Sequence, residues 1–212
     1  MANKIHVLIA DDHAIVRQGL KQILSETDDL VVAGEADDGA DAMQLARQQQ
    51  WDVFLLDVTM PNRNGIDTLK QLKKEFPRLP VLMLSMHPEE QYAVRAIKAG
   101  ASGYLTKQSA PEQLVTAIRQ VAQGKKYVSP TVAMQLADAI ASDSEKPLHE
   151  LLTDREFEVF RMLVAGKGPT DIAEQLHLSV KTVSTHKTHI LEKMAMDSTA
   201  DLVRYAVEHG LT

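Results

Sequence analysis

The sequence contains no cysteine, no long hydrophobic run and no excess of basic residues, and each absence excludes a class of protein or site. Without cysteine the chain has no disulfide, no thiolate metal site and no cysteine nucleophile. No apolar run approaches the ~18–20 residues that a helix needs to cross a bilayer. Residues 1–4 lead directly into strand-like sequence, without the organisation of a signal peptide. We therefore expect a soluble cytoplasmic protein with no membrane contact.

The charge balance is acidic, with 29 acidic and 23 basic residues among 212 and a formal net charge of −6. Both parts of the chain share this balance, because residues 1–145 hold 19 acids and 15 bases and residues 146–212 hold 10 acids and 8 bases. Proteins that neutralise nucleic-acid phosphates usually carry a basic footprint, so the balance argues mildly against nucleic-acid binding. The apolar fraction of 44% and the charged fraction of 25% are ordinary for a globular protein.

The first 125 residues alternate short apolar runs, typical of buried strands, with amphipathic patterns of helical period. Strands are expected at residues 5–10, 30–34, 53–58, 81–85 and 104–106. Helices are expected at residues 16–24, 39–50, 65–76, 89–98 and 111–123. Five strands alternating with five helices indicate a doubly wound α/β domain, in which a five-stranded parallel sheet is covered on both faces.

The pattern changes after Gly124. A helical pattern covers residues 132–140, the polar stretch 141–146 is typical of a linker, and only helical patterns follow from Leu152 onward. The sequence therefore predicts a small all-α domain after the α/β domain. The expected divisions are the α/β domain at 1–124, a linker with a helical segment at 125–147, and the all-α domain at 148–212.

Polar side chains stand where four of the expected strands end. Function gathers at the carboxyl ends of the strands in open α/β sheets. These ends carry Asp11, Asp12, Asp57, Ser85 and Lys107. Three carboxylates at one edge repel each other unless a cation joins them, and a purely oxygen ligand set suits Mg²⁺ or Mn²⁺. One such aspartate alone would simply cap a helix, whereas five polar groups at successive strand ends favour a phosphoryl-transfer site.

Three segments carry a family resemblance: residues 9–13 (Ile-Ala-Asp-Asp-His), residues 56–61 with Gly65, and residues 98–107. Together they resemble the receiver domain of bacterial two-component response regulators over residues 4–124, which implies a flavodoxin-like fold. The resemblance implies that Asp57 accepts a phosphoryl group. It also implies that Asp12, Asp57 and the backbone carbonyl of Thr59 bind Mg²⁺, and that Asp11 acts through a metal-bound water. Lys107 would pair with the phosphoryl group. Ser85 would be the switch hydroxyl and Tyr104 the aromatic side chain that changes rotamer.

The same resemblance implies a switch. Phosphorylation of Asp57 adds charge, Ser85 moves to hydrogen-bond it, and Tyr104 turns into the vacated space, which repacks the surface of the fourth helix, fifth strand and fifth helix. Tyr104 as a surface aromatic, with its hydroxyl in water, is the alternative. Thr59 and His87 flank the expected route of the hydrolytic water, and we expect them to set the lifetime of the aspartyl phosphate.

Residues 170–194 read as a helix, a turn and a second helix. The second helix, Val180–Met194, carries three lysines against a single glutamate, together with short hydroxyl side chains. Such a face suits major-groove readout, because lysines reach phosphates and compact side chains reach base edges. A solvated helix in a small bundle that binds protein is equally compatible with a bare helix-turn-helix.

The wider segment 148–212 resembles a DNA-binding domain of the LuxR/NarL type, through residues 152–159, 172–173, 178–179 and 190–194. The resemblance implies that Val180–Met194 is the recognition helix. It implies base-edge contacts by Ser184, Thr185 and Thr188. It implies phosphate contacts by Lys181, Thr182, Lys187 and Lys193, with His186 in packing or at a phosphate. The last helix, Ser198–His209, would pack under the recognition helix and supply a dimer surface.

Joined, the two halves resemble a NarL/FixJ-type response regulator, a transcription factor switched by aspartyl phosphorylation. We expect no enzyme activity beyond Mg²⁺-dependent self-phosphorylation and dephosphorylation at Asp57. The expected partners are a sensor histidine kinase or small phosphodonor, promoter DNA, a second copy of the chain, and RNA polymerase. Phosphorylation is expected to release the helical domain or promote dimerisation. A haloacid-dehalogenase-type phosphatase would need an aspartate where Thr59 stands, and a protein-interaction adaptor is the other alternative.

Overall fold

The computed structural model describes residues 4–60, 64–109, 111–141 and 147–211. The chain divides into two compact units, Met1–Ala139 and Ile140–Thr212. The first unit thus continues past residue 124 and includes much of the expected linker. Within the described ranges, no helix is long and apolar enough to cross a membrane.

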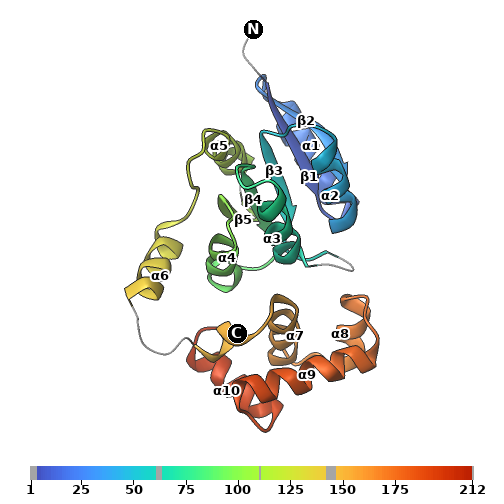
Figure 1. The fold of residues 1–212 in the computed structure, drawn as a ribbon, viewed down its shortest axis with the longest axis vertical. Coiled ribbons are helices and arrows are strands. Elements are labelled where there is room, and N and C mark those ends of the chain that lie inside the picture. The colour runs from blue at the N-terminus through green and yellow to red at the C-terminus, as the bar shows by residue number, and fades with distance from the viewer. Residues whose placement is uncertain (1–3, 61–63, 110, 142–146, 212) are drawn as a thin grey trace. The chain divides into compact units, whose positions relative to one another are not determined.

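The first unit is built on a five-stranded parallel sheet with the strand order β2-β1-β3-β4-β5 (Figure 1). The strands are β1 (Ile5–Ala10), β2 (Leu30–Ala36), β3 (Val53–Asp57), β4 (Val81–Ser85) and β5 (Gly103–Thr106). The predicted parallel sheet is therefore confirmed. β2 continues to Ala36 instead of ending at residue 34, because it stays paired with β1 as far as Ala10. Every residue of β3 and β4 is buried, which fits their continuous apolar sequence.

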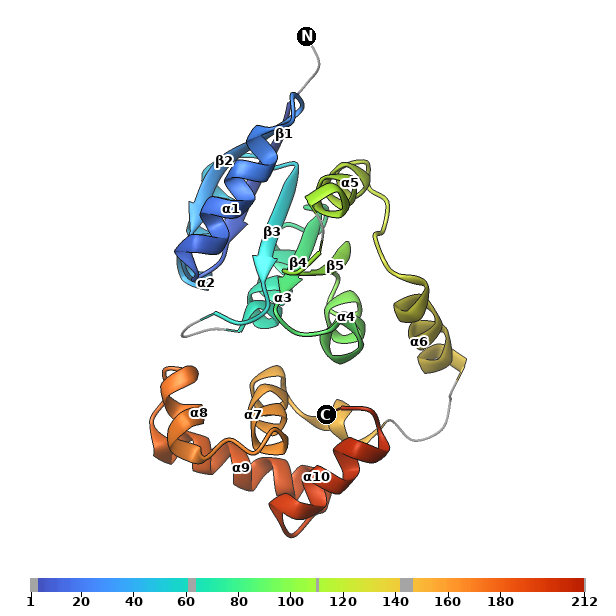
Figure 2. The same cartoon turned by 180° about the vertical axis from the view of Figure 1, so that it is seen from behind.

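Helices flank the sheet on both sides (Figures 1 and 2). They are α1 (Ala14–Ser25), α2 (Gly39–Gln48), α3 (Gly65–Glu75), α4 (Glu89–Lys98) and α5 (Pro111–Ala122). Side chains of α1 and α5, Leu24 and Ile118 among them, share one core cluster with Val7, Leu55 and Leu82 of the sheet. α2 contacts α3 and α3 contacts α4, so these three helices form the second layer. The carboxyl ends of the strands are held at one edge between the two layers.

The residues after α5 return to the edge of the sheet, and we call Lys126–Val132 the edge segment. Tyr127 N donates a hydrogen bond to Ser102 O at 2.8 Å, and Tyr127 forms a parallel bridge with Gly103. Ser129 Oγ donates to Glu89 Oε1 at 2.7 Å. A Cβ on Gly103 would lie 2.6 Å from Tyr127 O, so glycine permits this close approach. The edge segment thus ties the start of α6 (Pro130–Ala141) to β5 and α4.

The second unit is a helical domain. Its elements are the short 3₁₀ helix η1 (Leu148–Leu151) and the helices α7 (Asp154–Val164), α8 (Pro169–Gln175), α9 (Val180–Met194) and α10 (Thr199–Glu208). Buried side chains such as Phe157, Val183, Ile190 and Leu202 join these helices. Ser179 caps α9, as its sequence predicts, by accepting a hydrogen bond from Thr182 N at 3.0 Å. The predicted all-α domain with a helix-turn-helix is confirmed.

Candidate functional site

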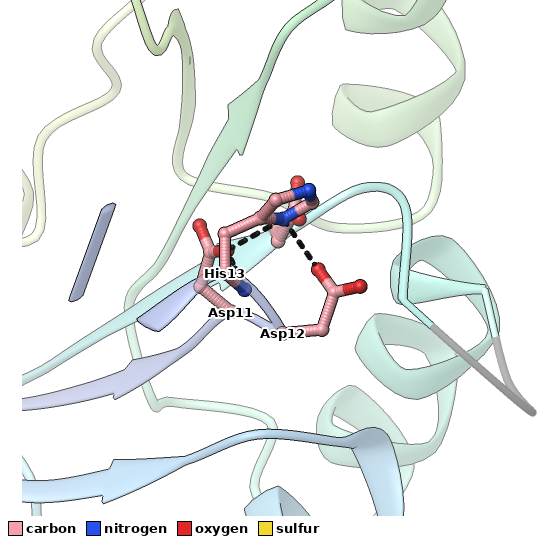
Figure 3. Close-up of side chains that lie close together, drawn as sticks. Asp11, Asp12 and His13 are labelled. Carbon is pink, nitrogen blue, oxygen red and sulfur yellow. Dashed lines mark hydrogen bonds and ion pairs between the residues drawn. The ribbon is translucent and has the colours of Figure 1, made fainter. Parts of the chain in front are cut away.

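The carboxyl ends of β1 and β3 bring together Asp11, Asp12, His13 and Asp57. One ligand atom from each of these four residues lies within 4.8 Å of the ligand atoms of the other three. Figure 3 shows Asp11, Asp12 and His13 with their polar groups turned toward one another. Asp11 and Asp57 are almost completely buried. The sheet topology therefore assembles the acidic cluster that the strand ends predict.

Lys107, which follows β5, contacts both buried carboxylates. Its Nζ lies 2.7 Å from Asp11 Oδ2 and 2.8 Å from Asp57 Oδ2, and only 5% of the lysine side chain is exposed. Backbone pairing fixes the approach, because Lys107 N donates to Ser85 O at 2.7 Å. One ammonium thus faces two carboxylates, which leaves the pocket with an excess of negative charge.

The pKa values of Asp57 and Lys107 reflect both the burial and the charge of the pocket. Burial raises the pKa of Asp57 to about 7, and the charge of Asp11 adds to this effect while Lys107 opposes it. Burial alone would lower the pKa of Lys107, but the charges and hydrogen bonds of Asp57 and Asp11 outweigh it and raise the pKa. The pocket therefore favours a further cation, which would let Asp57 ionise.

The donor set fits a hard divalent ion. Carboxylate oxygens of Asp11, Asp12 and Asp57 converge, and such oxygens are the ligands that Mg²⁺ and Mn²⁺ take. Asp12 Oδ1 is buried and lies 2.7 Å from His13 Nδ1, a contact that is an ion pair only while the imidazole is protonated. The three carboxylates repel each other, and a bound cation would offset that repulsion.

The first residue of α3, Gly65, packs directly against the backbone of Asp57 and Val58. Gly65 N donates to Val58 O at 2.8 Å, and a Cβ on Gly65 would lie 1.8 Å from Asp57 O. Asn64 is buried, and its side chain caps α3 by accepting from Ile66 N at 2.8 Å. The backbone of Asp57 therefore depends on a residue without a side chain at position 65.

Gly65→Ala is expected to destabilise the first unit by about 1–3 kcal/mol, because the added methyl group cannot fit without moving the Asp57 backbone. Urea unfolding followed by the fluorescence of Trp51, the single tryptophan, measures the change. Gly19→Ala is the matched control, since Gly19 lies within α1 and a Cβ added there would meet no atom of the described residues within 4 Å. Equal stabilities for the two variants would contradict the prediction.

Ser85, His87 and Tyr104 form a second group beside the pocket. Ser85 is fully buried, and its Oγ accepts a hydrogen bond from His87 N at 3.0 Å. Tyr104 is 3% exposed, and its hydroxyl donates to His87 O at 3.0 Å. The backbone of His87 thus links Ser85, at the end of β4, to Tyr104 of β5. Separately, Thr59 N donates to Asp57 Oδ1 at 3.3 Å.

The outward face of α9 carries the hydroxyl residues that the resemblance assigns to DNA. Ser184, Thr185 and Thr188 are exposed, and each hydroxyl donates to the carbonyl oxygen four residues earlier, at 3.0–3.2 Å. These bonds leave lone pairs on each hydroxyl oxygen directed outward. Lys181 is exposed at the start of the same helix, and Lys187 is half-buried.

Three other predicted contact residues also interact within the helical domain. Lys193 Nζ lies 2.6 Å from Oε2 of Glu156, whose carboxylate is buried in α7. Thr182 Oγ1 lies 2.8 Å from Ser179 Oγ. His186 is half-buried, and burial lowers its pKa. Its position agrees with the expectation that His186 packs, whereas nothing in the sequence spacing indicated the ion pair of Lys193.

Comparisons with known proteins fit both halves. Residues 7–119 match the response regulator receiver domain, and residues 150–206 match the bacterial regulatory proteins of the luxR family. The chain is 36% identical over 212 residues to the oxygen regulatory protein NreC of Staphylococcus carnosus, covering 97% of this chain and 98% of NreC. The chain belongs to the two-component response regulators. It is a DNA-binding member of the NarL/FixJ type.

Other response regulators support this placement. The response regulator GacA of Pseudomonas aeruginosa is 36% identical over 208 residues, covering 98% of this chain and 97% of GacA. The structure of RcsB from Salmonella enterica serovar Typhimurium, bound to promoter rprA with the phosphomimetic BeF₃⁻, aligns with a TM-score of 0.63 at 27% identity. That alignment covers 96% of this chain and 98% of the RcsB chain. Among the alternatives weighed from the sequence, the transcription factor is therefore the one that holds.

Two features of this response regulator are not predicted by its sequence pattern. Arg17 of α1 donates from Nη1 to the backbone O of Asp11 at 2.6 Å, which anchors the acidic loop. Asp154, Glu156 and Glu158 of α7 are buried, although acidic residues are rarely buried without partners. The motif Thr153-x-x-Glu156 is a capping box, which indicates a role for Glu156 at the start of α7 but not its burial.

Proposed function

We propose that the response regulator accepts a phosphoryl group on Asp57 and that this event controls promoter binding by α9. The observation that carries the proposal is the buried pair of Asp57 and Asp11 with Lys107 Nζ within 2.8 Å of both. A buried carboxylate facing a lysine at a strand end is a placed nucleophile with a counter-charge for the incoming group. The phosphoryl donor is a sensor histidine kinase or a small phosphodonor.

In the transfer, an oxygen of Asp57 forms a bond to phosphorus while the bond from phosphorus to the donor's leaving atom breaks, and the leaving group keeps that electron pair. Lys107 pairs with the phosphoryl oxygens and keeps Asp57 oriented. A bound Mg²⁺ or Mn²⁺ would screen the charges of donor and acceptor. The residues that would hold it are Asp12, Asp57 and the carbonyl of Thr59, with Asp11 acting through a bound water.

The added group carries about −1.5 to −2 charge, and Ser85, whose hydroxyl oxygen accepts from His87 N, would donate its own O–H to it. Tyr104 is coupled to the same backbone through His87 O, so a change at Ser85 reaches β5. The edge segment is paired with Gly103 at the beginning of β5. We infer that the switch alters how the segment leading into α6 is held, with dimerisation or release of the helical domain as its output.

At the DNA, Ser184, Thr185 and Thr188 would contact base edges, and Lys181, Thr182 and Lys187 would contact phosphates. Lys193 is paired with Glu156, whose charge offsets part of its attraction for a phosphate. A homodimer would place two recognition helices on paired half-sites, and Val203 and Val207 of α10 supply exposed apolar side chains for it. We expect this to occur in the cytoplasm, with RNA polymerase as a further partner.

The test uses the full chain with Mg²⁺ and acetyl phosphate. Intact-mass spectrometry should detect one phosphoryl adduct on the wild type and none on Asp57→Asn. Analytical ultracentrifugation and promoter footprinting should then differ between phosphorylated and unmodified protein. A phosphoryl adduct that persists in Asp57→Asn would overturn the assignment of the acceptor, and identical footprints would overturn the coupling.

Thr59 and His87 are expected to set the lifetime of the aspartyl phosphate, because their positions flank the approach of water to Asp57. Substitutions Thr59→Ala and His87→Ala should change the dephosphorylation rate constant by about 100-fold, the lower end of what a positioned acid or base contributes. Loss of the phosphoryl adduct with time after removal of the donor gives the rate. Thr27→Ala, on a loop before β2, is the control, and rate constants equal to wild type in both variants would sink the idea.

A further inference from the structure

The loop between β1 and α1 holds the buried Asp11, whose polar atoms are bound from several sides. Its N donates to Ala36 O of β2 at 3.2 Å, and its Oδ1 accepts from His13 N at 2.9 Å. Its Oδ2 lies 2.7 Å from Lys107 Nζ. The backbone O of Asp11 accepts a hydrogen bond from Arg17 Nη1 at 2.6 Å. A side chain six residues further along the chain thus satisfies the carbonyl of Asp11.

Arg17 is itself held beside β2. Its side chain is 18% exposed, and its Nε lies 3.8 Å from Glu35 Oε2. Glu35 also pairs with Lys21, one helical turn further along α1, with 2.7 Å between Lys21 Nζ and Glu35 Oε1. A guanidinium is planar and presents several donors in a fixed arrangement, so one side chain can lie beside the carboxylate and donate to Asp11 O at the same time. Arg17 therefore connects β2 with the acidic loop.

We propose that Arg17 is a positioning residue for the divalent ion, and that it acts through the peptide group between Asp11 and Asp12. This rests on the proposed function, which assigns the carboxylate of Asp12 to the ion. Because a peptide group is planar, a bond that fixes Asp11 O also fixes Asp12 N, and with it the point from which the side chain of Asp12 departs. Groups that orient metal ligands in this way typically contribute about 10- to 100-fold to metal affinity.

The charge of Arg17 and its hydrogen bond predict opposite effects on metal binding. A cation beside the pocket repels a second cation, so loss of the charge alone should strengthen Mg²⁺ binding. Loss of the hydrogen bond frees the peptide group after Asp11 and should weaken Mg²⁺ binding. We expect the second effect to prevail, and Arg17→Ala to bind Mg²⁺ about tenfold more weakly than the wild type.

Isothermal titration of the unphosphorylated full chain with MgCl₂ measures this affinity. Lys21→Ala is the matched control, because it removes one positive charge from the same helix and the other partner of Glu35 without touching the acidic loop. Its Mg²⁺ affinity should stay within about twofold of the wild type. Arg17→Met keeps most of the apolar stem, which guards against a loss of packing, and should show the same loss as Arg17→Ala. Arg17→Lys keeps the charge and a donor, and should recover part of the lost affinity.

Amide hydrogen exchange in EDTA gives a readout without metal. His13 N donates to Asp11 Oδ1, so its exchange should be faster in Arg17→Ala if the loop loosens. Mg²⁺ binding as tight as in the wild type, or tighter, in Arg17→Ala or Arg17→Met would overturn the proposal, and so would an equal loss in Lys21→Ala. If the wild type is phosphorylated at Asp57 while these variants bind Mg²⁺ normally, this inference fails alone. If Asp57→Asn still takes up the phosphoryl group, the proposed function fails instead.

Discussion

Asp57→Asn is expected to make the metal-free protein more stable above pH 7. Burial raises the pKa of Asp57 in the folded chain to about 7, from an ordinary 3.8 in the unfolded chain. The folded state therefore holds its proton more tightly, and stability that is present below pH 3.8 is lost as the pH rises through 7. Asparagine does not ionise, so the variant lacks the free-energy cost of ionising the buried carboxyl group. This cost is up to about 4 kcal/mol, at about 1.4 kcal/mol for each pKa unit.

Urea unfolding in EDTA, followed by Trp51 fluorescence between about pH 4 and 8, measures this difference. The difference in the free energy of unfolding between Asp57→Asn and the wild type should be small near pH 4 and largest near pH 8. Asp52→Asn is the control, because Asp52 is half-exposed and lies outside the pocket. A gap that is constant with pH, or an Asp57→Asn variant less stable than wild type at the alkaline end, would contradict the prediction.

Excess Mg²⁺ should reduce this difference in the free energy of unfolding, because a cation among Asp11, Asp12 and Asp57 stabilises the ionised form of the wild type. The variant lacks one carboxylate and should respond less. The acidic pocket thus lowers the stability of the metal-free protein, and the proposed ion would offset this cost.

The strand positions and the site at their carboxyl ends could be predicted because both follow from local patterns. β3 and β4 are continuous apolar runs, and parallel pairing brings Asp11, Asp57 and Lys107 to one edge without further information. The resemblance to receiver domains then assigned roles that spacing alone does not reveal, such as that of Tyr104.

The remaining features depend on contacts between residues far apart in the sequence. The sequence of the edge segment resembles a linker, and its place at the sheet edge is shown by contacts such as the pairing of Tyr127 with Gly103. The buried Glu156 reads as an ordinary helix-surface acid, because its partner Lys193 lies 37 residues further along the chain.

Lys181→Ala combined with Lys187→Ala is expected to weaken promoter binding by about 10- to 100-fold at physiological salt. The domain carries no basic excess, so the few lysines of α9 supply most of the phosphate contacts that the proposal assigns to this helix. Each lost contact lowers the slope of log K against log salt by about 0.9, so the double variant should lose about two units of slope. Fluorescence anisotropy with a labelled promoter fragment at several salt concentrations measures both the affinity and this slope.

Lys125→Ala combined with Arg78→Ala is the matched control, because it removes the same charge from exposed positions of the first unit. An equal loss of slope in the control would show that net charge, and not a contact of α9, determines binding.

Lys193→Ala tests whether Lys193 of α9 contacts DNA or instead stabilises the helical domain through its ion pair with Glu156. Its ammonium lies 2.6 Å from Glu156 Oε2, and Glu156 otherwise depends on the backbone N and hydroxyl of Thr153. Removal of the lysine leaves a buried carboxylate short of its counter-charge, which should lower the melting temperature of the helical domain. The salt slope should fall by less than the roughly 0.9 of a full phosphate contact, since the charge of Glu156 already offsets part of the charge of the lysine. A full loss of slope at unchanged stability would make Lys193 a phosphate contact like Lys181.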